Sequence, residues 1–353
     1  MSQSIYQYVR SLPSDKCAFI DIDGTLTANP WDTSEKDLLD KDLTNQAIQE
    51  LQNQGYLCIL STSRTAEMCM SEKQYRISKK RFGFSRPEPH MGRGEDDKRI
   101  YVKQENYFPT QMLDLPIIIS SSGAQISVLQ KEGGYHDDVD FYPVDFPSPS
   151  IWRSDTLILL SSFTASFMLG EIESEKSYMN GETEIFPADY RIQLIFSSQE
   201  ELNLFSKEIH KQRGLHITND SNPDKNLYSA YVTPKNGKIE AIEYVLSTFD
   251  KPPAEVLIMG DSLPDLEAGL HVSGSHGSHI SFFLVGGSRL YPYLVDKDKN
   301  TFAGVSLNTA KNIISLPPMD RRIVLSDALF PGLIGPRSIV EFLDKKRYNE
   351  HTL

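Results

Sequence analysis

The chain has 353 residues, of which 39% are hydrophobic and 24% charged, so it can bury a substantial core and is long enough for two domains. Its formal net charge of −12 argues against non-specific nucleic-acid binding but does not exclude an anionic substrate. No apolar stretch is long enough to span a bilayer, and residues 1–14 lack the pattern of a signal peptide. We therefore expect a soluble, cytoplasmic protein that binds neither nucleic acid nor membrane, with Cys17, Cys58 and Cys69 as reduced thiols.

The first predicted element is a short buried strand at residues 18–20, which leads directly into Asp21 and Asp23 and then into Gly24 and Thr25. An apolar run that stops at a Gly-containing turn is typical of a parallel sheet, where ligands bind beyond the carboxyl ends of the strands. Strand alternation sends both carboxylates to the same side, where they repel unless a cation neutralises them or one holds a proton. The stretch predicts a metal-assisted acid/base site.

A helix at 43–54 and a buried strand at 56–60 follow, and the strand ends in the hydroxyl cluster 61–64, Ser-Thr-Ser-Arg. A hydroxyl at this place could donate a hydrogen bond to a phosphoryl oxygen or simply cap a helix. Residues 66–116 are the least regular part, and the basic stretch 73–103 favours a solvated insertion over a substrate-gripping flap. A third buried strand is predicted at 115–120.

Residues 127–232 change character. Strands with partial alternation are predicted at 139–144, 156–163, 192–196, 215–218 and 227–232, and Ser198 and Glu201 form a capping box that opens a helix to about residue 213. This mixture predicts a separate α+β module with a half-exposed sheet. Within it, packing or surface roles are favoured over substrate contact for Tyr190, Arg191 and Tyr228.

The chain then returns to strongly apolar elements that carry charged side chains. Lys238 falls in the first turn of a predicted helix, which is unfavourable for the helix dipole unless an anion such as phosphate lies close by; Lys235 is the alternative. A strand at 256–259 ends in Gly260, and Asp261 and Asp265 follow on a turn that can direct both carboxylates to one Mg²⁺. A polar loop is favoured over a metal site for His271, His276 and His279. A further core strand is predicted at 280–285, and one short amphipathic helix at 338–346.

These segments together resemble the four motifs of the haloacid dehalogenase superfamily of phosphotransferases, in the same order. Motif one is Asp21-x-Asp23-Gly24-Thr25, motif two is the hydroxyl cluster, motif three is Lys238, and motif four is Gly260-Asp261-x-x-x-Asp265. The resemblance implies an α/β fold, a Rossmann-like doubly wound parallel sheet core with an inserted α+β cap domain. The core would comprise residues 1–126 and 233–353, and a cap of the large type-two kind residues 127–232.

The resemblance also implies a role for each motif residue. Asp21 would be the nucleophile that forms an aspartyl-phosphate, and Asp23 the general acid and then the base. Magnesium would be held by Asp21, the carbonyl of Asp23, Asp261 and, directly or through water, Asp265. The phosphoryl oxygens would be bound by the amides of Gly24 and Thr25, by Thr62 (with Ser61 as the alternative), and by Ser63 and Lys238.

The implied activity is Mg²⁺-dependent hydrolysis of a small phosphorylated metabolite, with a sugar phosphate as the favoured substrate class in the Cof-type branch. Ser122 and Pro264 stand where that branch commonly has Asn, which leaves the substrate open. A phosphomutase of the phosphomannomutase type is the alternative, although the arginine expected shortly after motif one is absent. A non-catalytic phosphate-binding protein is disfavoured by the intact charge cluster.

Overall fold

The computed structural model describes most of the predicted core and part of the predicted cap. The described residues are 6–12, 15–27, 41–82, 114–138, 140–141, 156, 158–159, 192–196, 198–209, 211, 214–219, 221, 228–234, 237–273, 278–296, 298–302, 305–315 and 321–350. No helix within these ranges combines the length and the apolar character that a membrane span requires.

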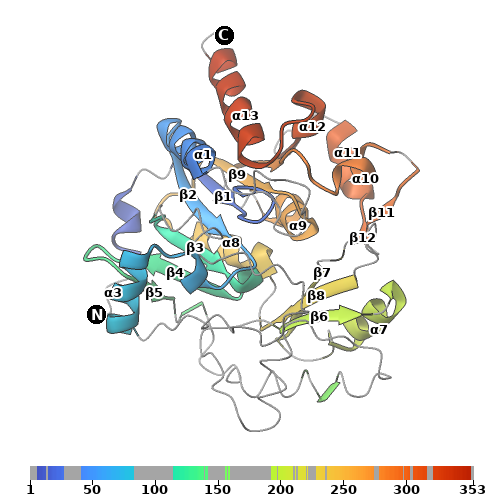
Figure 1. The fold of residues 1–353 in the computed structure, drawn as a ribbon, viewed down its shortest axis with the longest axis horizontal. Coiled ribbons are helices and arrows are strands. Elements are labelled where there is room, and N and C mark those ends of the chain that lie inside the picture. Colours follow the sequence, from blue (N-terminus) through green and yellow to red (C-terminus); the bar gives the residue numbers. More distant parts are fainter. Residues whose placement is uncertain are drawn as a thin grey trace, which may run out of the picture.

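An eight-stranded sheet forms the centre of the molecule (Figure 1), in the order β13-β10-β9-β1-β2-β3-β4-β5. Its strands are β1 (Lys16–Ile20), β2 (Tyr56–Ser61), β3 (Ile117–Ser120), β4 (Gln125–Leu129), β5 (Tyr135–Asp137), β9 (Glu255–Gly260), β10 (His279–Leu284) and β13 (Arg321–Leu325). All neighbours from β13 to β3 pair in parallel, whereas β4 and β5 run antiparallel at one edge. The chain proceeds from β1 outward on one side and from β9 outward on the other, which makes β1 and β9 the topological switch point.

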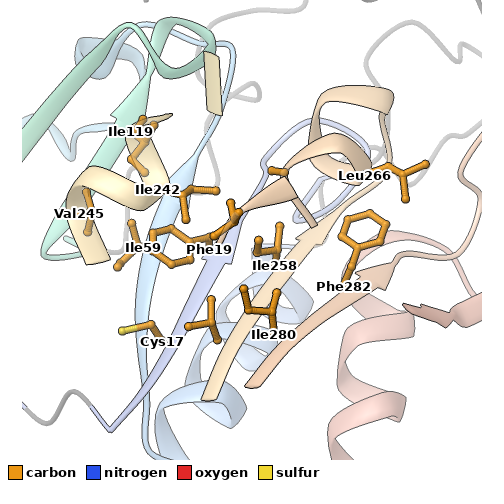
Figure 2. Packing of buried hydrophobic residues seen from close by; sticks show 14 of the residues in the cluster. Cys17, Phe19, Ile59, Ile119, Ile242, Val245, Ile258, Leu266, Ile280 and Phe282 are labelled. Atoms are coloured by element: carbon orange, nitrogen blue, oxygen red, sulfur yellow. The ribbon is translucent and has the colours of Figure 1, made fainter. Parts of the chain in front are cut away.

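Alternate residues of the central strands feed two separate hydrophobic cores. Cys17 and Phe19 of β1 belong to the core under α8 (Gly237–Ser247) and α9 (Leu263–His271), part of which Figure 2 shows. Ala18 and Ile20 point the other way, into the core under α1 (Lys41–Asn53) and α13 (Gly335–Glu350). The predicted doubly wound α/β core is therefore confirmed.

The remaining short elements connect these layers or border them. They are η1 (Val9–Ser11), α2 (Ala66–Cys69), α3 (Glu72–Phe82), η3 (Ser121–Gly123), α10 (Tyr291–Val295), β11 (Thr301–Phe302), β12 (Val305–Ser306), α11 (Asn308–Ser315) and α12 (Ser326–Leu329). Strands β11 and β12 pair as a small antiparallel ribbon.

A second, three-stranded antiparallel sheet lies at the end of the molecule opposite α13 (Figure 1), with the order β6-β8-β7. Its strands, β6 (Ile192–Phe196), β7 (His216–Asn219) and β8 (Tyr228–Thr233), confirm three of the five strands predicted for the cap. Helix α7 (Gln199–Ile209) covers it with Leu202, Phe205 and Ile209, and its first turn is capped by a bond from the Glu201 N–H to Ser198 Oγ. The expected α+β insertion is thus present as a sheet with its own small core.

Three expectations differ from the structure. Strands β4 and β5 extend the large sheet as far as Asp137, so a boundary at residue 127 would cut through β4. Of the strand expected at 156–163, the described residues 156 and 158–159 are helical. The start of the basic stretch is not loose: α3 packs along β5, where Gln74 accepts a bond from the Gly134 N–H at 2.6 Å and Ser78 one from the Tyr135 N–H at 2.7 Å.

Two further expectations are only partly met or fall outside the structure. The amphipathic helix of the C-terminal region is longer than predicted, and this region also supplies the edge strand β13. Of the strand predicted at 139–144, the described residues 140 and 141 form a turn, and the other four lie outside the described residues. Tyr190, Arg191, Lys235, His276 and the basic residues from 83 to 103 also lie outside them.

Candidate active site

The residues of motif one lie at the carboxyl end of β1, where β1 and β9 form the topological switch point of the sheet. Asp21 follows β1 directly, and its N–H donates to the carbonyl of Met259 on β9 at 3.0 Å. This bond continues the β1–β9 ladder past Ile20 and so holds Asp21 beside the end of β9, just before Asp261. Both carboxylates are at least nine-tenths buried, at 6% and 8% exposure. The sequence analysis expected the two carboxylates to share one site, from their places after buried strands and from the resemblance to motifs one and four.

Lys238 in the first turn of α8 reaches into this cluster. Its Nζ donates to Asp21 Oδ1 at 2.9 Å and to Asp265 Oδ1 at 2.6 Å. These two carboxylates are the anions that offset its unfavourable place at a helix N-terminus, whereas the sequence had suggested a bound phosphate for that purpose. The lysine therefore joins residues that are 217 and 27 positions away in the chain.

The protonation of the pair reflects its burial. Burial raises the pKa of Asp21 well above its ordinary value; the Lys238 ammonium opposes this effect, and the neighbouring Asp265, Asp261 and Asp23 add to it. Burial by itself lowers the pKa of Lys238, but the Asp21 and Asp265 carboxylates outweigh it, so that the lysine pKa lies above its ordinary value. Lys238 therefore remains charged at neutral pH.

Two glycines make room for the carboxylates. Gly24 has φ +79°, and a Cβ on it would lie 2.3 Å from Asp261 Oδ2. At Gly260 a Cβ would lie 2.2 Å from Asp265 Cγ. The Gly in motif one is therefore required both by its backbone conformation and by the approach of a carboxylate from motif four.

Asp21, Asp261 and Asp265 together could hold a metal ion. Among the described residues they are the group whose ligand atoms converge, with all three within 4.8 Å of one another. Asp265 Oδ2 accepts bonds from Ser262 Oγ at 2.6 Å and from the Ser262 N–H at 3.3 Å, and Oδ1 faces Lys238, which suits a contact through water. Buried carboxylate oxygens are the ligands that Mg²⁺ prefers. His271 and His279 are exposed and take no part.

Asp23 lies apart from this cluster and has a different partner. Both of its oxygens accept hydrogen bonds from Arg64, from Nε to Oδ2 at 2.8 Å and from Nη2 to Oδ1. The Arg64 side chain is 6% exposed and that of Asp23 is 29% exposed, so the carboxylate faces the mouth of the site. Sequence reasoning had used Arg64 only to align motif two; the signal in the sequence is that a buried arginine needs a carboxylate partner.

Strand β2 brings the hydroxyls of motif two to the same end of the sheet. The β1–β2 register pairs Ile20 with Leu60, which sets Ser61 beside Asp21. Thr62 Oγ1 accepts a bond from the Arg64 N–H at 3.2 Å and keeps its own proton to donate. Ser61 Oγ and Thr25 Oγ1 are buried without a hydrogen-bond partner among the described residues, whereas Ser63 is half-buried.

The small sheet approaches the site at the start of α8. A Cβ on Gly237 would lie 3.1 Å from His216 Nε2 and 3.4 Å from Thr218 Oγ1, both on β7. On the other side, a Cβ on Gly123 would lie 2.2 Å from the carbonyl carbon of Gly237. The cap strand, η3 and the helix that carries Lys238 therefore meet at one point, which the sequence did not reveal.

Comparisons with known proteins found no matching family model and no matching curated protein. Among solved structures, the chain is similar to the sucrose-phosphatase from Synechocystis (11% identity, TM-score 0.49, 94% of this chain and 98% of that one). It is also similar to a haloacid dehalogenase-like hydrolase from Bacteroides thetaiotaomicron (14%, 0.47, 94% and 98%). A third is the trehalose-6-phosphate phosphatase from Aspergillus fumigatus (12%, 0.42, 81% and 87%). Identities this low and TM-scores below 0.5 do not establish a common function.

Proposed function

We propose that the chain is a phosphatase of the haloacid dehalogenase superfamily, a Mg²⁺-dependent phosphomonoester hydrolase that acts on a small metabolite, with a sugar phosphate as the favoured substrate. The observation that carries this proposal is the convergence of Asp21, Lys238, Asp261 and Asp265, from three separate segments, on the carboxyl end of β1. A structural ion pair does not require a lysine between two buried carboxylates with a third carboxylate converging on the same point. A carboxylate nucleophile, a lysine and carboxylates that can hold a cation are the groups that transfer of a phosphoryl group can use.

The charges of the described site residues support a divalent cation. Asp21, Asp23, Asp261 and Asp265 can contribute four negative charges, against which Lys238 and Arg64 contribute two positive ones. Asp21, Asp261 and the Asp23 carbonyl would hold Mg²⁺, with Asp265 directly or through water. When bound, Mg²⁺ would reduce the repulsion between the attacking carboxylate and the phosphate.

In the first step an Asp21 carboxylate oxygen forms a bond to phosphorus while the bond from phosphorus to the leaving oxygen breaks. The Asp23 carboxyl gives its proton to that leaving oxygen, so that an alcohol departs. Lys238 stays charged and close to Asp21, where it can stabilise the negative charge on the phosphoryl oxygens. The amides of Gly24 and Thr25 and the hydroxyls of Thr62 and Ser63 would orient these oxygens.

In the second step Asp23 takes a proton from water as the water oxygen attacks the aspartyl-phosphate. The bond between phosphorus and Asp21 breaks, inorganic phosphate leaves, and both carboxyl groups return to their starting state. The partial exposure of Asp23 lets water reach it, while Asp21 stays protected from other nucleophiles.

The test is phosphate release from a panel of sugar phosphates, nucleotides and p-nitrophenyl phosphate, with Mg²⁺, with chelator, and with Asp21→Asn. We expect release that needs Mg²⁺ and is lost in Asp21→Asn, because only the carboxylate can form the intermediate. The compound hydrolysed best would identify the substrate class. If folded, Mg²⁺-loaded protein released phosphate from no compound, the proposal would be wrong.

A further inference from the structure

The forked contact between Asp23 and Arg64 has no role in the mechanism above. Each Asp23 oxygen accepts a separate guanidinium donor, Nε on one side and Nη2 on the other. A planar fork of this kind fixes the plane of a carboxylate as well as its distance, which a lysine cannot do. The contact joins motif one to the loop after β2, 41 positions away.

The backbone of Arg64 is fixed by two hydrogen bonds, one from its N–H and one to its carbonyl. Its N–H donates to Thr62 Oγ1 at 3.2 Å, and its carbonyl accepts the N–H of Ser121 at 2.7 Å. Ser121 and Ser122 both have positive φ, at 50° and 57°, a conformation that serine rarely adopts. The Ser122 N–H bonds the Thr62 carbonyl at 3.1 Å, so this strained turn supports the backbone that presents Arg64.

From this geometry we propose that Arg64 is a positioning residue that directs the Asp23 carboxyl toward the leaving-group oxygen. The inference rests on the proposed phosphatase function. Asp23 lies directly before Gly24, whose φ is positive, and is partly exposed, so without the fork its side chain could rotate between the site and solvent. The Arg64 side chain is itself buried, and its two bonds to the Asp23 carboxylate restrict that rotation.

The fork also explains how orientation survives proton transfer. When one Asp23 oxygen carries the proton that passes to the leaving oxygen, the other keeps its bond to Arg64, and the protonated oxygen retains a lone pair for the second guanidinium donor. The side chain then stays in place while its proton moves to the alcohol and returns from water. A single-donor lysine would hold only one oxygen and leave the carboxyl free to turn about that bond.

The experiment compares two kinds of leaving group. An alkoxide needs a proton as it departs, whereas p-nitrophenolate leaves as a stable anion. We therefore expect Arg64→Gln to lower kcat/KM about 10²-fold for the best alkyl phosphate of the panel and less than about tenfold for p-nitrophenyl phosphate. Asp23→Asn should show the same selectivity, and the double variant should lose little more than either single one, because both remove one interaction.

Two further variants separate positioning from general damage. Arg64→Lys keeps the charge but not the fork and should recover little of the activity on the alkyl phosphate, whereas added guanidinium ion should rescue Arg64→Gln in part. Arg10→Gln is the matched control, since Arg10 contacts Thr248 and Asp250 just after the carboxyl end of α8 and should behave as wild type. Equal losses for both substrates, or additive losses in the double variant, would overturn the proposal and assign Arg64 to phosphate binding or stability.

Failure of the phosphatase proposal would be seen separately, as a wild-type protein that releases no phosphate. A crystal structure of Arg64→Gln provides a readout that does not depend on turnover. We expect the Asp23 side chain to occupy more than one rotamer there. A single Asp23 conformer that matches the one described above would overturn the positioning role, whatever the wild-type activity.

Discussion

Gly24 is the residue on which motif one and motif four meet. Its φ of +79° suits glycine, but the stronger constraint is that Asp261 fills the space where a side chain would begin. Gly55, between α1 and β2, has nearly the same φ of +82° and nothing within 4 Å of its Cβ position. A comparison of alanine substitutions at the two glycines therefore distinguishes the effect of backbone strain from the effect of crowding in the site.

We predict that Gly24→Ala abolishes phosphate release and that Gly55→Ala does not. The strain of a positive φ costs each variant about 1–2 kcal/mol of unfolding free energy. Only Gly24→Ala must also displace the Asp261 carboxylate. Phosphate release and chemical denaturation of both variants measure the two effects, and an active Gly24→Ala enzyme would contradict the assignment of Asp261 to the metal site.

Lys238 offsets the charge of the buried carboxylates of Asp21 and Asp265. We predict that Lys238→Met destroys activity and lowers the unfolding free energy of the metal-free protein by about 3–5 kcal/mol, because two buried carboxylates lose their counter-ion. Mg²⁺ should then raise the melting temperature more in this variant than in wild type. Lys251→Met is the control, since the pair of Lys251 with Asp15 is exposed on both sides and should change stability little.

At the scale of elements, the central strands could be predicted because each is an apolar run that ends at a polar turn. Strands β1, β2, β9 and β10 fall within a residue or two of their expected positions. Strand β13 was missed because it opens with Arg321 and Arg322 and lies at the sheet edge, where such a strand need not be apolar throughout. Strands β4 and β5 were not predicted, and their residues from 127 onward were placed in the cap, because nothing local marks this stretch as the antiparallel edge of the large sheet.

The site residues that could be predicted are those that a short stretch of sequence places at a strand end or in the first turn of a helix. Asp21, Asp261, Asp265 and Lys238 lie on strand ends or first helical turns, and the fold brings them together. The partner of Asp23 was not foreseen, because the contact depends on how two loops 41 positions apart face each other. The meeting of β7 with Gly237 was hidden for the same reason.

Helix α3 shows how an element with few apolar residues can still belong to the core. Its buried face carries Gln74 and Ser78, which satisfy the backbone of β5, and Gln74 Nε2 also donates to Asp114 at 3.0 Å. We predict that Gln74→Ala lowers the unfolding free energy by about 1–3 kcal/mol, since the Gly134 N–H loses its partner in a buried place. Lys73→Ala, one residue away on the exposed face, should change it by less than about 0.5 kcal/mol. Equal effects in chemical denaturation would show that α3 is not docked.

At the scale of the whole molecule, ionisation of the site is coupled to unfolding. Asp21 has a pKa above its ordinary value of 3.8 because burial disfavours its charged form, so this carboxyl keeps its proton to higher pH in the metal-free folded state than in the unfolded chain. The contribution of Asp21 to stability is therefore greatest at low pH and is lost as the pH rises above 3.8 toward the raised pKa. A divalent cation reverses this penalty, because it favours the ionised carboxylate.

We therefore predict that Mg²⁺ at 100 times its Kd at pH 8 stabilises the protein by about 2.7 kcal/mol at that pH, and that the same concentration stabilises it less at pH 5.5. Thermal unfolding with Mg²⁺ and with chelator at both pH values measures the difference. Asp21→Asn should remove most of the pH dependence, because an amide does not ionise at either pH, and it should also weaken the effect of Mg²⁺. A stabilisation of the same size at pH 5.5 and pH 8 would show that Asp21 is not a ligand and that the cation binds elsewhere.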